Sequence, residues 1–146
     1  MKKKLNLKDH LERTFTIDKR AVNEDETHQT FEIAFSSEEP YERYFGSEVL
    51  DHEQQSVRLD RLNSGAAVLV NHDSSDQVGV VVSASVDDDK RGRALIRFSK
   101  SKRGREISTD VEDGIRQLVS VGYRIHKYET TEREGLSDLV RVTDWE

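Results

Sequence analysis

The region that most limits how this chain can fold is a run of alternating residues in its second half. Between Val78 and Val86, aliphatic side chains recur at every second position. A period of two is typical of a β-strand with one face against a core. Residues 87–92 (Asp-Asp-Asp-Lys-Arg-Gly) have the composition of a turn, and the alternation resumes through Ala94, Ile96 and Phe98. We therefore predict a β-hairpin.

Other apolar segments predict further short strands, at 30–35, 66–71, 118–125 and 139–142. A capping box, in which Thr109 and Glu112 satisfy each other's backbone donors, predicts the start of a helix. This order lacks the regular alternation of strands and helices that a doubly wound fold requires. We expect an α+β domain, built on a small antiparallel β-barrel or strongly curved sheet and flanked by a few short helices.

Three polar segments are expected to lie outside this core. Residues 1–29 predict a charged, flexible arm, which leaves 30–146 as the folded domain. The stretch 36–56 predicts a partner-facing loop, and 99–105, with its lysines and arginines, predicts a basic loop.

Composition excludes several classes of function. A formal net charge of −6 argues against a general nucleic-acid binder. The absence of cysteine rules out disulfides, thiolate metal sites and cysteine catalysis. No apolar run approaches the roughly 18 residues that span a bilayer. We expect a soluble intracellular protein with no membrane or nucleic-acid partner.

The segment Leu118-Val-Ser-Val-Gly-Tyr-Arg-Ile125 contains a candidate nucleophile. On a strand, Ser120 projects from the face opposite to the valines, and Gly122 follows on the same face without a side chain. A substrate backbone could then approach the hydroxyl closely. A backbone amide near Gly122 is a candidate for holding an oxyanion.

A serine nucleophile needs a base, and histidine serves best near neutral pH. His72 ends the predicted strand 66–71 and is the best candidate. His10 and His28 fall in the predicted arm and His52 in the polar loop, whereas His126 lies roughly 20 Å from Ser120 along an extended strand. No metal-ligand spacing occurs near His72, and no cofactor is expected.

An ordered set of motifs resembles the prohead (capsid maturation) proteases of tailed phages. It comprises Val70-Asn-His-Asp, Val78-Gly-Val, Gly104-Arg-Glu, Val111-x-x-Gly and Leu118-Val-Ser-Val-Gly-Tyr. The resemblance runs from about Thr30 to the end of the chain. It implies a fold similar to the herpesvirus assemblin proteases, a β-barrel flanked by helices.

The same resemblance implies a serine endopeptidase with Ser120 as nucleophile and His72 as general base. Its substrates would be scaffold segments, the major capsid protein and the protease itself, inside the immature capsid in the host cytoplasm. Relatives usually continue beyond a Trp-Glu pair like Trp145-Glu146, so this resemblance leads us to expect a domain truncated at its C-terminal end. The third catalytic group would be Glu146, Asp144 or a carboxylate beyond the end.

Two other classes of function remain open. A capsid assembly or scaffolding domain could keep the protease fold without catalysis. A carbohydrate- or peptide-binding module is suggested only by the aromatics Tyr41, Tyr44 and Phe45. A homodimer is expected by analogy with the herpesvirus proteases.

Overall fold

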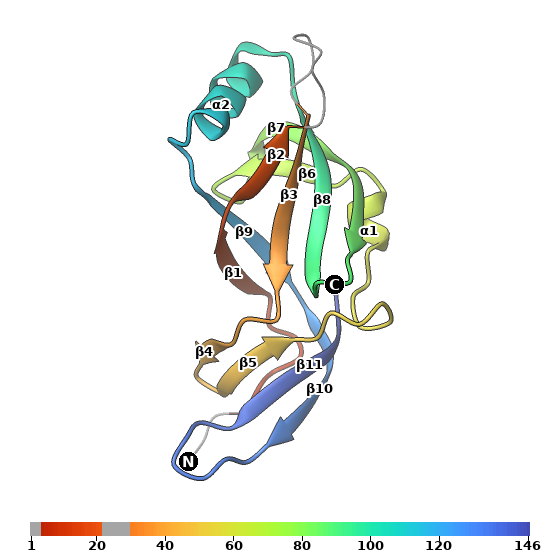
Figure 1. Cartoon of the computed structure of the whole chain (residues 1–146), viewed down its shortest axis with the longest axis vertical. Coiled ribbons are helices and arrows are strands. Elements are labelled where there is room, and N and C mark those ends of the chain that lie inside the picture. Colours follow the sequence, from red (N-terminus) through yellow and green to blue (C-terminus); the bar gives the residue numbers. More distant parts are fainter. Residues whose placement is uncertain (1–3, 22–29) are drawn as a thin grey trace.

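We describe the fold from a computed structural model, which covers residues 4–21 and 30–146. This part of the chain is mostly β-structure with two short helices (Figure 1). The helices are α1 (Asp60–Asn63) and α2 (Lys102–Glu112). The strands are β1 (Leu11–Thr16), β2 (Asp18–Ala21), β3 (Thr30–Ser37), β4 (Tyr41–Arg43), β5 (Gly46–Leu50), β6 (Ala67–Val70), β7 (Asp73–Val86), β8 (Arg91–Phe98), β9 (Leu118–Tyr123), β10 (Ile125–Thr131) and β11 (Leu139–Trp145).

The larger sheet has the antiparallel order β2-β3-β8-β7-β6 and curls into a half-barrel (Figure 1). Its centre is the predicted hairpin, which the pairing of β7 with β8 confirms. Buried aromatic and aliphatic side chains from these strands and from α2 form one core cluster. Its members include Phe31, Ile33, Phe35, Val78, Ile96, Phe98, Ile107 and Val111.

The alternation along β7 is interrupted within the strand. A register shift between Val81 and Ser83 places an irregularity there. As a result Val81 is buried whereas Val82 is 47% exposed, although a strict period of two puts Val82 on the face of Val78. Such an irregularity increases the local twist of a strand, which fits the curl of this sheet.

The second sheet has the order β10-β11-β5-β4, with β11 and β5 parallel. The prediction of a loop over 36–56 was wrong, because this stretch contains β4 and β5. Every residue of β5 is buried. Two of them, Ser47 and Glu48, are polar, so the strand has no hydrophobic periodicity to reveal it.

A third, two-stranded sheet joins β1 to β9; we call it the ribbon. Residues 11–16 and 18–21 of the predicted arm therefore form strands that pair with the rest of the fold, β1 with β9 and β2 with β3. The arm's residues 1–3 and 22–29 lie outside the described residues. After Arg124 the chain of β9 continues as β10, so one run of residues links the ribbon to the second sheet.

Helix α2 begins earlier than the capping box predicted. Its N-cap is Ser101, whose hydroxyl accepts a hydrogen bond from the Gly104 amide at 3.1 Å. The helix buries Ile107 and Val111, so the basic segment expected as a loop is mostly its first turns. The prediction that the helix starts at Thr109 was therefore wrong.

The expected α+β class is confirmed at a coarse level. The described strands pair into three sheets, one of them a half-barrel. The finer expectation of a herpesvirus-protease-like barrel stays a prediction.

Candidate active site

Ser120 lies in the middle of β9 and is paired with Thr14 of β1. In an antiparallel pair, directly opposite residues project from the same face. Ser120 and Thr14 therefore share one face of the ribbon with the next pair, Gly122 and Glu12. Ser120 is half-buried, while Thr14 and Glu12 are exposed. We call this surface the open face of the ribbon.

His72 occupies the two-residue turn between β6 and β7. Val70 pairs with Asp73, and the two residues between them have positive φ angles, 53° at Asn71 and 56° at His72. Positive φ at both central positions defines a tight type I′ hairpin turn. Asparagine and histidine adopt this conformation more readily than most residues other than glycine.

The turn brings the His72 side chain to the open face. Its Nε2 lies 3.8 Å from Oε2 of Glu12, and both side chains are partly exposed. Because Glu12 faces the same way as Ser120, the two residues that the sequence selected approach one surface from different sheets. The described residues contain no direct hydrogen bond between Ser120 and His72.

The space above Gly122 is occupied. A Cβ atom placed on Gly122 would collide with Nε2 of His10. The expected gap for a substrate backbone is therefore filled by a second imidazole. His10 therefore lies at the open face together with His72. The sequence analysis did not expect this, because it placed His10 in a flexible arm.

Glu146 lies against a different histidine from the one expected. Its Oε1 is 3.0 Å from Nε2 of His126. Its backbone exchanges hydrogen bonds with Arg124, which holds it beside the start of β10. The contact recorded for the Glu146 carboxylate is thus with His126, and the carboxylate in contact with His72 is Glu12.

The alternative carboxylate, Asp144, forms a bidentate ion pair with Arg58. Both of its carboxylate oxygens accept hydrogen bonds from Arg58, each at 2.8 Å. The hydrogen bond from Arg58 is the main cause of a lowered pKa at Asp144. This carboxylate is engaged by a guanidinium.

A second serine–histidine pair is buried between β3 and the end of β5. The Ser36 hydroxyl and His52 Nε2 are 2.8 Å apart, and His52 Nδ1 is 2.7 Å from the Leu50 carbonyl oxygen. Ser36 is 2% and His52 is 1% exposed. Burial lowers the pKa of His52. A substrate has no access to this pair, and sequence reasoning missed it because the surrounding segment is polar.

Behind the ribbon, a buried charged cluster fixes β1 in place. Arg13 donates hydrogen bonds to the Glu48 carboxylate at 2.7 Å and to the Glu48 carbonyl at 3.0 Å. The Tyr123 hydroxyl also donates to this carboxylate. Burial, together with the negative charge of Glu48, raises the pKa of Tyr123 to about 12. Arg43 donates to the backbone carbonyl of Glu12 at 2.5 Å. The strand that carries Glu12 is thus held from the buried side.

The aromatics of 41–45 divide between surface and core. Tyr41 and Tyr44 are 42% and 53% exposed, whereas Phe45 is buried in the second core cluster. Arg43 lies over the Tyr41 ring at 4.5 Å from its centroid, and the Tyr44 hydroxyl donates to Asp9. These contacts give both tyrosines structural partners.

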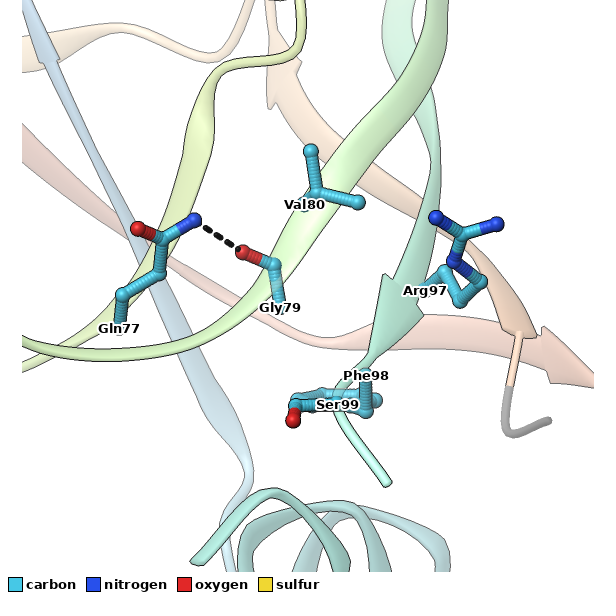
Figure 2. Close-up of a pocket in the computed structure, with 6 residues that line it drawn as sticks. All are labelled: Gln77, Gly79, Val80, Arg97, Phe98 and Ser99. Atoms are coloured by element: carbon cyan, nitrogen blue, oxygen red, sulfur yellow. Dashed lines mark hydrogen bonds between the residues drawn. The ribbon is translucent and has the colours of Figure 1, made fainter. Parts of the chain in front are cut away.

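A shallow depression of about 330 Å³ lies where β7 and β8 approach α2, and Figure 2 shows the residues that line it. The Gln77 amide donates to the Gly79 carbonyl at 3.0 Å within it. Neither Ser120 nor His72 lines this depression. The lining residues are Gln77, Gly79, Val80, Arg97, Phe98 and Ser99.

No group of three or more His, Asp or Glu side chains among residues 4–21 and 30–146 could hold a metal ion. Neither helix in this part of the chain is long and apolar enough to cross a membrane.

Sequence comparison relates the chain to phage capsid polypeptides. It is 47% identical over 117 residues, 78% of its length, to the major capsid protein of Halomonas phage phiHAP-1. The match covers 19% of that capsid protein, so the chain corresponds to a region of a much longer relative. No protein-family model and no solved structure matches the chain.

Proposed function

We propose that this chain is a capsid assembly domain of a bacteriophage, acting with the major capsid protein in the immature capsid inside the host cell. The observation that carries the proposal is the 47% identity to a region of a phage major capsid protein. Identity at this level over 117 residues indicates common ancestry. In that relative the matching region belongs to the same polypeptide as the rest of the capsid protein.

Assembly can be tested by co-expression with the major capsid protein of the same phage. Sedimentation of the products separates shells from free subunits. We expect this chain to sediment with the shells or with their precursors. Normal shell assembly without this chain, combined with its absence from every shell fraction, would overturn the proposal.

A second candidate function is that of a serine endopeptidase, which would process scaffold segments, the capsid protein and itself. It is favoured by the approach of His72 and Ser120 to one exposed surface. Resemblance to the prohead proteases supports the same assignment. A homodimer remains part of this hypothesis by analogy.

In this reaction the Ser120 oxygen bonds to the scissile carbonyl carbon while His72 takes the hydroxyl proton. The carbon–nitrogen bond then breaks as His72 returns that proton to the leaving amine. Water attacks the acyl-enzyme, with His72 again accepting a proton, and releases the carboxylic acid and free Ser120. A backbone amide near Gly122 would stabilise the oxyanion once the His10 ring has turned away from this glycine.

Labelling with a fluorophosphonate, followed by intact-mass measurement and peptide mapping, tests this chemistry. We expect one adduct on Ser120 that is lost in Ser120→Ala and in His72→Ala. His10→Ala is the matched control, because it removes the other histidine at the open face. Equal labelling of wild type and His72→Ala would reject His72 as the base, and loss of labelling only in His10→Ala would transfer that role to His10.

Absence of any adduct would leave the non-catalytic assembly domain as the function. Cleavage of co-expressed capsid protein provides the independent readout. Ser120→Ala should abolish that cleavage and leave the circular dichroism spectrum and the melting temperature unchanged.

A further inference from the structure

We propose that Glu12 is the positioning residue that holds the His72 imidazole toward Ser120. The inference rests on the endopeptidase candidate and adds a group to its site from the N-terminal strand. Glu12 would act through His72 and would not itself contact substrate.

The first support is the contact between the two side chains. Oε2 of Glu12 lies 3.8 Å from Nε2 of His72, and the side chains are 54% and 38% exposed. This separation is that of an ion pair, slightly beyond a hydrogen bond. Because both side chains are partly exposed, a small side-chain rotation would complete the hydrogen bond.

The second support is the direction in which Glu12 projects. Its partner across the ribbon is Gly122, two residues from Ser120 on the same face. Glu12 therefore reaches His72 from the side of the sheet that carries the hydroxyl. A carboxylate on the opposite face of β1 could not orient the imidazole toward Ser120.

The third support is the way the Glu12 backbone is fixed. Its carbonyl oxygen accepts a hydrogen bond from Arg43, and the next residue, Arg13, is bound to the buried Glu48. A positioning group works only if its own backbone is held. These arginine contacts supply that support from the buried side of the strand.

A carboxylate that accepts the proton on one imidazole nitrogen fixes the tautomer. With Nε2–H donated to Glu12, the lone pair is on Nδ1. The Ser120 proton would therefore pass to Nδ1 and from there to the leaving amine. The proposal thus specifies which nitrogen acts as the base.

The experiment compares glutamate variants in the whole chain by fluorophosphonate labelling rate. Glu12→Gln should lower the rate about fivefold, since a solvent-exposed ion pair contributes weakly. Glu12→Asp should recover part of it. Glu129→Gln is the control: it removes the same charge at an exposed position of β10 and should label at the wild-type rate. Glu146→Gln tests the rival carboxylate.

Nitrogen NMR of the His72 ring is the second readout, and it does not depend on catalysis. We expect the neutral ring to carry its proton on Nε2 in the wild type and to lose this preference in Glu12→Gln. An unchanged tautomer and labelling rate in Glu12→Gln would overturn the proposal, as would a rate loss confined to Glu146→Gln. If the wild type does not label but the tautomer still depends on Glu12, the endopeptidase function fails and the contact stands as structural.

Discussion

This molecule contains two serine–histidine pairs in opposite environments. Ser36 and His52 meet at 2.8 Å in the interior, where the second nitrogen of the ring is also close to a backbone carbonyl. Ser120 and His72 approach one exposed surface and have no direct hydrogen bond. Close geometry alone would select the first pair, whereas the exposed position of His72 favours the second, where the His10 ring covers Gly122. Hydrogen-bond distance and accessibility therefore select different pairs in this molecule.

The largest expected contrast comes from removing each histidine. His72→Ala should reduce fluorophosphonate labelling at least a hundredfold, because general-base catalysis contributes about 10²–10⁴. Its melting temperature should fall only slightly, because alanine adopts the left-handed backbone conformation of His72 less readily than histidine, at a cost of about 1 kcal/mol.

His52→Ala should behave in the opposite way. It leaves a cavity and an unpaired Ser36 hydroxyl, and we expect a loss of about 2–4 kcal/mol in the free energy of unfolding. Urea denaturation measures this loss. A His72→Ala destabilised as much as His52→Ala, or a His52→Ala that unfolds like wild type, would break the distinction between the two pairs.

Two glycines give a second contrast of smaller size. A Cβ at Gly92 would collide with the Ser36 hydroxyl and lie 2.7 Å from the Phe35 ring, inside the core. Gly92→Ala should therefore cost roughly 1–3 kcal/mol, as overpacking does. Gly122→Ala needs only the exposed His10 ring to turn away, so we expect a change of about 0.5 kcal/mol or less. Thermal unfolding of the two variants compares them, and equal destabilisation would contradict this view.

The smallest effect concerns pH and the buried pair. Burial lowers the pKa of His52 in the folded protein, so the unfolded chain binds a proton at higher pH than the folded one. The contribution of His52 to stability is present above its unfolded pKa of about 6.5 and is lost as pH falls toward the folded value.

Between pH 7.5 and 5.5 we therefore expect the free energy of unfolding to decrease. His52→Gln, which cannot titrate in this range, should have a flatter profile. Identical profiles for wild type and His52→Gln would show that the buried ring does not couple to pH.

The sequence predicted those parts of the fold whose residues alternate. The β7–β8 hairpin and the strand of Ser120 were found, because one face of each meets a core. β5 was missed, since Glu48 is buried through a charged partner, Arg13, that lies on a distant strand. The first turns of α2 were mistaken for a loop because they are basic, and the helix was expected to start only at Thr109.

The candidate site was predicted in part. Ser120 and His72 were selected from local patterns, and their shared surface follows from the pairing of β1 with β9. Glu12 and His10 were missed because that pairing is not encoded locally. The Glu146 carboxylate contacts His126, a consequence of the turn from β9 into β10 that periodicity does not reveal.

The ribbon has a consequence for the order of folding. Its two strands lie near opposite ends of the sequence, so the loop that their pairing closes contains most of the chain. Long-range pairing is slow because the loss of chain entropy precedes the gain in contacts. During synthesis β1 is made before the other described strands and stays unpaired until β9 has been made. The surface with Ser120 is therefore among the last parts of the fold to assemble. A nascent chain would therefore display Glu12 and His72 before Ser120 has been synthesised.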